Sequence, residues 1–172
     1  DRWVIGEVCK RVADAHQRDL PHRHMHYSVN LSGTTLGNSF FLDFIRNLFV
    51  EYKIPTQQIC FEITETAAIQ NLEAAMMFIK SVRELGCKFA LDDFGSGMSS
   101  FAYLKNLSVD YLKIDGAFVK RLATDPTQYS IVKAVNAVGH TMQMETIAEF
   151  VEDDDIIRGL SEIGVDYAQG YG

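Results

Sequence analysis

The sequence predicts an α/β protein with the TIM-like (β/α)8 barrel fold, and two observations carry this prediction. Six strand-like segments alternate with helical segments over 172 residues, which is the pattern of parallel strands joined by crossover helices. Each strand has an apolar face and a face that turns polar toward the carboxyl end; Phe61 and Ile63, for example, oppose Glu62. An open, doubly wound sheet would be apolar on both faces. A barrel packs its outer face on helices and keeps polar groups at the upper end of its inside, so the barrel is favoured.

Apolar spacing and turn signals define the elements in order. Pro21 and Pro55 end the first two helices, and Gly86 is expected as the C-terminal cap of the third. The expected helices cover residues 2–19, 40–49, 72–85, a short segment from Ser99 or Ser100, 131–142 and a last helix opened by the acidic residues 153–155. The expected strands cover residues 27–32, 59–64, 89–93, 111–115, 145–149 and 165–171.

The composition is typical of one globular domain, with 47% hydrophobic and 23% charged residues. Eight barrel strands usually occupy about 250 residues. We therefore expect residues 1–172 to be a partial domain with about six of its eight strands, truncated at the N-terminus and clipped at the C-terminus. No apolar run is long enough to span a bilayer. Cys9, Cys60 and Cys87 lie far apart and are expected as reduced core residues of a cytoplasmic domain.

The net charge of −7 argues against binding to a DNA or RNA polymer. It does not exclude a small anionic ligand, provided that a bound metal reverses the charge locally.

Polar side chains gather at the carboxyl ends of the predicted strands, which a parallel barrel brings to one mouth. Buried carboxylates need compensation, so this repetition is not expected of an ordinary core. Carboxylates, an amide oxygen and a lysine suit one or two divalent cations such as Mg²⁺ or Mn²⁺. Two such cations can convert a bridging water into a nucleophile and neutralise the oxygens of a phosphate ester. The gathered residues are Asn30, Glu62, Asp92, Asp93, Lys113, Glu149 and Gln169.

Asp92 and Asp93 adjoin at the end of an apolar run that begins at Phe89. Because strand side chains alternate, both carboxylates cannot point inward along an ideal strand, but both can reach one site if the strand ends there. The alternative is an acidic turn that caps the following helix. This stretch alone leaves both interpretations open.

Six short motifs follow one another along the whole chain: Val-Asn-Leu-Ser at 29–32, Glu-Ile-Thr-Glu at 62–65, Asp-Asp-Phe-Gly-Ser-Gly at 92–97, Leu-Lys-Ile-Asp at 112–115, Ala-Glu-Phe-Val-Glu at 148–152 and Ala-Gln-Gly-Tyr at 168–171. In these motifs the chain resembles the EAL-type phosphodiesterases, which hydrolyse the bacterial second messenger cyclic di-GMP. Each motif alone is weak, but six in order at compatible spacing are highly specific. The resemblance implies hydrolysis to linear pGpG with two divalent cations, Mg²⁺ or Mn²⁺.

The resemblance also implies roles for individual side chains. Asp92 would bridge the two cations, Lys113 would hold the nucleophilic water or the scissile phosphate, and Glu149 would bind the second cation or act as a base. The implied metal ligands are Asn30, Glu62, Asp92, Asp93 and Glu149, and the implied catalytic residues are Lys113, Glu149, Glu62 and Asp92.

Further residues are implied around this centre. Glu65 would anchor the flexible loop over residues 94–100, with Glu152 as a supporting acid. The substrate-binding side chains would be Gln169, Asp115 and Ser32. The implied partners are cyclic di-GMP, a second copy of the domain in a homodimer, and fused sensory or GGDEF-type domains in a cytoplasmic protein, free or membrane-anchored.

The sequence departs from the family pattern at two places. The Glu-Ala-Leu motif that names the family, with its metal-binding glutamate, is expected on a strand before residue 1. The usual glycine after the fifth motif's glutamate is Phe150. We expect the ring to be tolerated, because strand alternation would turn residue 150 away from Glu149.

Other functions fit parts of the sequence. His22, His24 and His26 could bind zinc, although a polar connection is the commoner outcome of such a segment. Lys113 could form a Schiff base, but neighbouring acids stabilise its charged form. Residues 93–95 match the Asp-Phe-Gly motif of kinases, without the other kinase motifs. A non-catalytic receptor for cyclic di-GMP is the strongest alternative, and the glutamate expected before residue 1 discriminates it from an enzyme.

Overall fold

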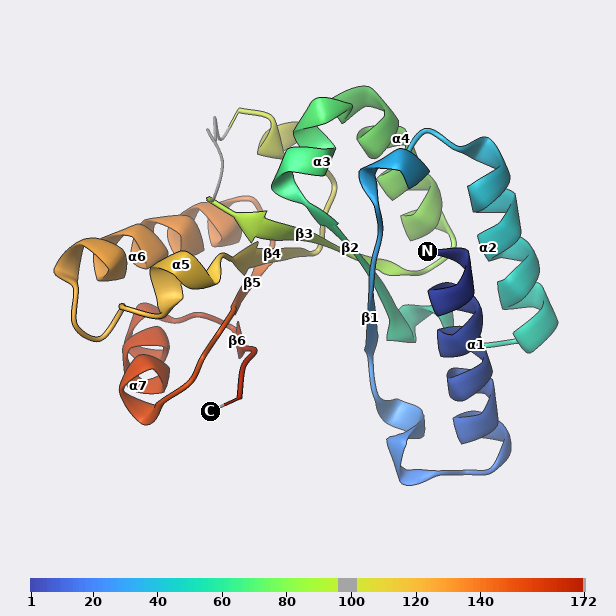
Figure 1. Ribbon diagram of the computed structural model, residues 1–172, viewed down its shortest axis with the longest axis horizontal. Helices are drawn as coiled ribbons and strands as arrows, with labels where there is room; N and C mark the ends of the chain where they lie inside the picture. Colours follow the sequence, from blue (N-terminus) through green and yellow to red (C-terminus); the bar gives the residue numbers. More distant parts are fainter. Residues whose placement is uncertain (96–101, 172) are drawn as a thin grey trace. The chain divides into compact units, whose positions relative to one another are not determined.

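The computed structural model describes residues 1–95 and 102–171 (Figure 1). Strands and helices alternate along the described chain as predicted. The α-helices are α1 (Arg2–Gln17), α2 (Ser39–Tyr52), α3 (Glu65–Gln70), α4 (Leu72–Glu84), α5 (Gly116–Val119), α6 (Pro126–Thr141) and α7 (Asp154–Ile163). The strands are β1 (Tyr27–Asn30), β2 (Ile59–Thr64), β3 (Lys88–Phe94), β4 (Tyr111–Ile114), β5 (Glu145–Ala148) and β6 (Tyr167–Ala168). Short 3-10 helices are η1 (Pro21–His24), η2 (Gly33–Thr35), η3 (Thr56–Gln58) and η4 (Leu104–Asn106).

Each predicted strand is present, although the last is much shorter than the expected span over residues 165–171. The short helices α3 and α5 were not expected from the sequence. The helix expected from Ser99 or Ser100 lies outside the described residues.

The strand order supports the predicted barrel-type topology. The strands occur in the sheet in sequence order, from β1 to β6. The pairings of β1 with β2, of β3 with β4, of β4 with β5 and of β5 with β6 are all parallel. A doubly wound sheet reverses its strand order at a switch point, whereas a barrel adds every strand on the same side. The predicted TIM-like α/β fold, incomplete here, is confirmed.

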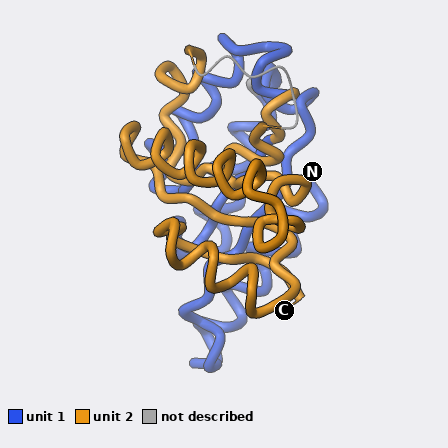
Figure 2. Tube along the Cα trace, turned by 90° about the vertical axis from the view of Figure 1, so that its left-hand side faces the viewer, with its two compact units in different colours: residues 1–63, 67–89 blue, residues 64–66, 90–172 orange. Residues whose placement is uncertain are grey.

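The chain divides into two compact units, which Figure 2 colours separately. Unit 1 comprises Asp1–Ile63 and Ala67–Phe89, and unit 2 comprises Thr64–Thr66 and Ala90–Gly172.

The core of unit 1 is aromatic where helices α2 and α4 meet the start of β3. The ring centroids of Phe41 and Phe78 are 6.2 Å apart, and those of Phe78 and Phe89 are 6.4 Å apart. Burial raises the pKa of Cys9 to about 11 and that of Cys87 to about 12, so both thiols stay neutral. Both cysteines are free and buried, as expected of reduced core residues.

Helix α4 ends as its sequence predicts. Gly86 follows the helix with a φ of 92°, the left-handed conformation that glycine adopts without steric cost. A side chain here would also meet Thr56, because an added Cβ would lie 2.7 Å from Oγ1 of that residue.

In unit 2, a polar network joins helix α6, strand β5 and the residue that precedes β6. Oδ2 of Asp166 accepts hydrogen bonds from N of Thr146 at 2.7 Å and from Nε2 of His140 at 2.8 Å. Oγ1 of Thr146, which is fully buried, lies 2.5 Å from Oδ1 of Asn136. Burial alone would raise the pKa of Asp166, but the hydrogen bonds from Thr146 and His140 outweigh it, so the pKa lies below its ordinary value.

Helix α7 confirms the predicted acidic start. The Asp153 side chain accepts a hydrogen bond from N of Ile156 at 2.8 Å and thereby caps the helix.

Among the residues that the structure describes, none of the helices is long and apolar enough to cross a membrane.

Candidate active site

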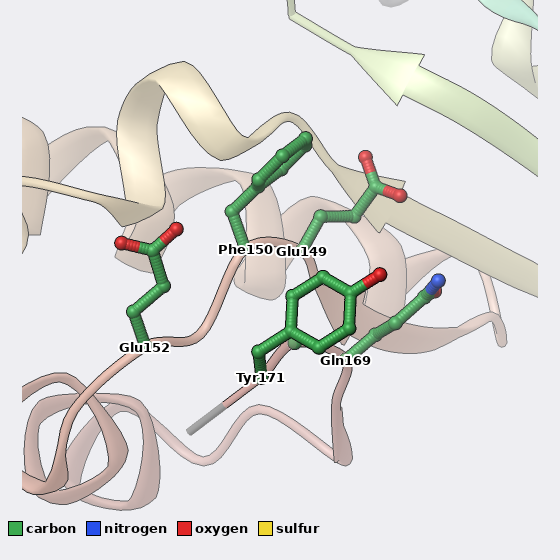
Figure 3. Close-up of a pocket in the computed structure, with 6 residues that line it drawn as sticks. Glu149, Phe150, Glu152, Gln169 and Tyr171 are labelled. Atoms are coloured by element: carbon green, nitrogen blue, oxygen red, sulfur yellow. The ribbon is translucent and has the colours of Figure 1, made fainter.

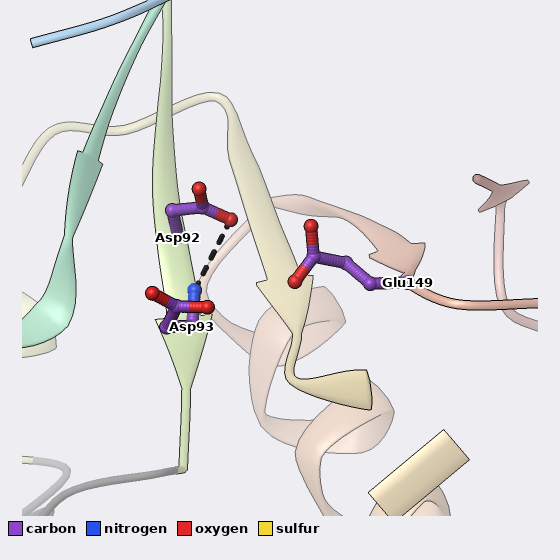
Figure 4. A group of neighbouring side chains, drawn as sticks. All are labelled: Asp92, Asp93 and Glu149. Atoms are coloured by element: carbon purple, nitrogen blue, oxygen red, sulfur yellow. Dashed lines mark hydrogen bonds between the residues drawn. The ribbon is translucent and has the colours of Figure 1, made fainter. Parts of the chain in front are cut away.

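Asp92 and Asp93 come together through an irregularity in strand β3. The register between β3 and β4 shifts between Leu91 and Phe94, and Asp93 has a left-handed φ of 54°. Both carboxylates can therefore reach the same side, although β3 continues past them to Phe94. β3 ends at Phe94, one residue after Asp93, and a register irregularity rather than an ideal strand end brings the two carboxylates together. Figure 4 shows both aspartates on β3, with Oδ1 of Asp92 accepting a hydrogen bond from N of Asp93 at 3.1 Å.

Lys113 is a buried cation between two acids. Its Nζ lies 2.8 Å from Oδ1 of Asp92 and 2.9 Å from Oε1 of Glu149, and only 3% of its side chain is exposed. Alternation along β4 places it opposite the apolar faces of Leu112 and Ile114. A buried charge is tolerated when it is paired in this way. The two ion pairs favour the charged ammonium, which argues against a Schiff-base function.

The site carries more negative charge than Lys113 neutralises. Burial raises the pKa of Glu149, and the charges of Asp92 and Asp93 add to this effect, while Lys113 opposes it. Burial likewise raises the pKa of Asp93, reinforced by Asp92 and Asp115 and opposed by Lys113. Such a cluster attracts a cation.

The three carboxylates have the arrangement of a cation site. One oxygen each from Asp92, Asp93 and Glu149 lies within 4.8 Å of the others. In Figure 4, Glu149 extends from the segment after β5 toward the two aspartates of β3. Hard carboxylate oxygens on a rigid support are the ligands that Mg²⁺ and Mn²⁺ prefer. The donor set therefore fits a divalent cation.

Asn30 and Glu62 form a separate pair in unit 1. They are direct partners in the parallel pairing of β1 with β2. Glu62 is buried, and its backbone oxygen accepts a hydrogen bond from N of Leu31 at 2.8 Å. Asn30 and Glu62 belong to unit 1, whereas the three acids belong to unit 2. That all five residues bind the same metal ions therefore stays a prediction.

Glu65 connects two segments of unit 2 that flank residues 96–101. Its buried carboxylate accepts a hydrogen bond from N of Gly95 at 2.9 Å and one from the hydroxyl of Tyr103 at 2.5 Å. Burial, and then the neighbouring Glu65, raise the pKa of Tyr103, which keeps the phenol protonated as a donor. Sequence reasoning missed Tyr103, because nothing local relates it to a glutamate 38 positions earlier. The loop-anchoring role of Glu65 stays a prediction.

A cavity of about 390 Å³ adjoins Glu149 (Figure 3). The backbone fixes its wall, because N of Gln169 donates to O of Ala148 at 2.8 Å. Gln169, predicted from sequence, therefore lies beside Glu149, and the exposed Glu152 lines the same cavity. The lining residues are Glu149, Phe150, Glu152, Gln169, Gly170 and Tyr171.

Phe150 requires a correction. Strand β5 ends at Ala148, so strand alternation does not extend to residue 150 and cannot turn it away from Glu149. Both side chains instead line the same cavity. The φ of Phe150 is 54°, a left-handed conformation that favours glycine, which accounts physically for the glycine expected at this position.

Ser32 and Asp115 already have partners within the protein. N and Oγ of Ser32 both donate to Oδ2 of Asp1 at 2.9 Å. Oδ1 of Asp115 accepts from N of Ala117 at 2.7 Å and caps helix α5. Their role in substrate binding stays a prediction.

The zinc alternative at His22, His24 and His26 gains no support. Within residues 1–95 and 102–171, the group of metal-ligating side chains that converges is Asp92, Asp93 and Glu149.

Comparison with known proteins agrees with the geometry. The sequence model of the EAL domain matches residues 1–172. The cyclic di-GMP phosphodiesterase PdeB of Shewanella oneidensis is 51% identical over 144 residues, which cover 84% of this chain and 17% of PdeB. The cyclic di-GMP phosphodiesterase PdeA of Borreliella burgdorferi is 38% identical over 145 residues, which cover 84% of this chain and 22% of PdeA. The chain thus spans about a fifth of the length of these curated relatives.

Solved structures give the same result. The phosphodiesterase PaMucR in complex with c-di-GMP matches with a TM-score of 0.88 and 31% identity, over 98% of this chain and 68% of that chain. The FimX EAL domain of Pseudomonas aeruginosa bound to c-di-GMP matches with a TM-score of 0.90 and 30% identity, over 99% of this chain and 67% of that chain. The chain belongs to the EAL domain family.

Proposed function

We propose that this chain forms part of a cytoplasmic phosphodiesterase domain that hydrolyses cyclic di-GMP to linear pGpG with two divalent cations, Mg²⁺ or Mn²⁺. The observation that carries the proposal is the buried Lys113 paired with both Asp92 and Glu149, next to Asp93. A purely structural core would not retain three carboxylates around one lysine, because the surplus charge is costly to bury. The names of the relatives PdeB and PdeA supply the substrate.

The acids of unit 2 would hold the cations. Asp92, Asp93 and Glu149 offer converging oxygens, and Asn30 and Glu62 are proposed to complete the ligand set. When bound, Mg²⁺ or Mn²⁺ supplies positive charge to phosphate oxygens and lowers the pKa of a coordinated water.

The other side chains would orient the substrate and move protons. Lys113 presents three N–H donors, so it can turn from its carboxylate partners toward a phosphate oxygen or the attacking water and stabilise developing negative charge. Glu149 is well placed to accept a proton from that water, since it borders the cavity and the lysine together. Gln169, on the same cavity wall, can donate an amide N–H to the ligand.

The partners of the whole protein are also proposals. We propose that the chain functions within a longer EAL domain, here called the full domain, that dimerises and is fused to sensory or GGDEF-type domains. The support is that the chain spans 24% of MucR, whose name describes a bifunctional diguanylate cyclase and cyclic di-GMP phosphodiesterase.

The decisive experiment incubates the full domain with cyclic di-GMP and Mg²⁺ or Mn²⁺ and separates the products by chromatography. We expect pGpG, no product after chelation, and no turnover by Asp92→Asn. Glu149→Ala and Lys113→Ala should lower kcat by roughly a hundredfold or more with affinity within about tenfold, because both groups act mainly on the transition state.

Glu51→Gln, which removes an exposed acid of helix α2, is the matched control and should retain wild-type turnover. Intact cyclic di-GMP after an overnight incubation, together with tight binding, would instead identify a receptor. Retention of more than a few per cent of the wild-type rate by Asp92→Asn would refute the two-cation assignment.

A further inference from the structure

Phe150 occupies a backbone conformation that costs free energy for any residue except glycine. Its φ is 54°, whereas the residues on either side are held by backbone hydrogen bonds, one to strand β4 and one to the residue after β6. N of Glu149 donates to O of Ile114 at 3.2 Å, and N of Val151 donates to O of Gln169 at 3.1 Å. The chain therefore has to turn at Phe150 itself.

Helix α5 holds the ring of Phe150 in place. Gly116, the first residue of α5, is buried under this ring, and a methyl group added there would put its carbon 2.7 Å from Cγ of Phe150. Nζ of Lys120 lies 4.2 Å from the ring centroid, which is a cation–π contact. Strained conformations persist only where surrounding contacts enforce them. The contacts with Gly116, in α5, and with Lys120, the residue that follows α5, provide that enforcement.

Lys113, the ion-pair partner of Glu149, lies on the strand just before α5. Helix α5 begins two residues after the last residue of β4, and β4 carries Lys113, whose Nζ lies 2.9 Å from Oε1 of Glu149. The ring therefore attaches the residue after Glu149 to the helix after Lys113. Figure 3 shows the side chains of Glu149 and Phe150 projecting from adjacent backbone positions beside the cavity.

We propose that Phe150 is a positioning residue: its ring, seated on Gly116 and Lys120, maintains the left-handed turn that directs Glu149 toward Lys113. The inference deepens the proposed function, on which it rests, because Glu149 and Lys113 act there on the phosphodiester. On this proposal, the backbone conformation at residue 150, rather than contact of the ring with substrate, determines the rate of turnover.

Two substitutions separate these possibilities. Phe150→Gly removes the ring, but glycine adopts the left-handed turn freely, so kcat of the full domain should stay within about threefold of wild type. Phe150→Ala removes the ring and keeps the steric cost of Cβ, so kcat should fall about tenfold with KM nearly unchanged. Equal losses for both variants with raised KM would mean that the ring contacts substrate, and wild-type values for both would mean that it has no role; either result overturns the proposal.

Lys53 provides the matched control. It also has a left-handed φ, 50°, at the C-terminal end of helix α2 in unit 1. Lys53→Gly and Lys53→Ala should therefore differ in stability but share the wild-type kcat. A tenfold loss of kcat in Lys53→Ala would show that strain anywhere lowers activity and would overturn the assignment to Phe150.

A second measurement is independent of hydrolysis. Gly116→Ala should lower the melting temperature more when Phe150 is present than in the Phe150→Gly background, because the three heavy atoms nearest to the added Cβ all belong to the side chain of Phe150. The same decrease in both backgrounds would overturn the seating of the ring.

If wild type does not hydrolyse cyclic di-GMP, the proposed function fails, and positioning is then decided by Mn²⁺ affinity. Weaker binding by Phe150→Ala than by Phe150→Gly supports the inference, and equal affinities overturn it.

Discussion

Replacing Lys113 by methionine removes the buried cation of the site and leaves Asp92 and Glu149 without it. Lys113→Met keeps most of the side-chain volume, so the main loss is electrostatic. Removal of one partner from a buried ion pair costs about 3–5 kcal/mol, because the remaining charge stays in a poorly solvated place. Lys113 is only 3% exposed and makes two such pairs, at 2.8 and 2.9 Å, so solvent screens little of this loss. We expect the free energy of unfolding to fall by about that amount in the full domain with EDTA, as measured by urea denaturation at pH 7.5.

The loss should depend on pH with a defined sign. The pKa of Glu149 is already raised in the folded protein, first by burial, and loss of Lys113 removes the contact that lowers it. A carboxyl whose folded pKa lies above its unfolded value costs stability at high pH, and this cost disappears as pH falls through the folded pKa. The deficit of Lys113→Met should therefore shrink between pH 7.5 and pH 5.

Two variants make the test specific. Lys80→Met, on the exposed side of helix α4, should change the free energy of unfolding by less than about 0.5 kcal/mol. Adding Asp92→Asn and Glu149→Gln to Lys113→Met should restore at least half of the loss, because neutral groups replace the unpaired charges. A deficit below about 1 kcal/mol, or one that is the same at pH 7.5 and pH 5, would refute the electrostatic account of this buried lysine.

Two further predictions concern the polar contacts of unit 2. Asp166→Asn should lower the urea midpoint at pH 7, and the difference from wild type should start to shrink as pH falls below about 4. The reason is that a carboxyl with a lowered folded pKa contributes stability that is present above its unfolded pKa and is lost as pH falls through its folded pKa. A difference that does not shrink below about pH 4 would contradict this. Tyr103→Phe should lower the free energy of unfolding by about 1–3 kcal/mol, because it removes a hydrogen-bond donor from the buried carboxylate of Glu65. Urea denaturation measures this loss, with Tyr171→Phe, at a fully exposed residue, as the control. Equal midpoints for the two variants would show that the hydrogen bond contributes nothing.

The sequence was sufficient to predict the parallel strands and the polar residues at their ends, because alternation in short strands is a local property. Glu62 and Lys113 follow directly from it, as buried polar residues opposite apolar faces. The cap at Gly86 is likewise local, since its left-handed φ depends only on where helix α4 stops.

The remaining features depend on irregular backbone or on distant contacts. Asp93 and Phe150 both have left-handed φ values, and a side-chain pattern gives no indication that a non-glycine residue adopts one. The pairing of Tyr103 with Glu65 joins residues 38 positions apart and has no periodic signal. Ideal strand geometry therefore failed to predict the backbone around the candidate active site.

The sequential strand order of unit 2 has a consequence for synthesis on the ribosome. Strands β4, β5 and β6 each pair with the strand made immediately before them. Each new strand can therefore pair with a strand that has already been made, and the chain segment that has to close between successive strands is short, which lowers the entropic cost of closure. A growing chain that has reached Glu149, the residue after β5, already carries Asp92 and Lys113, whereas Gln169 is added last. Ribosome-stalled chains that end after Glu149 would thus be expected to contain the charged cluster before the cavity wall is complete.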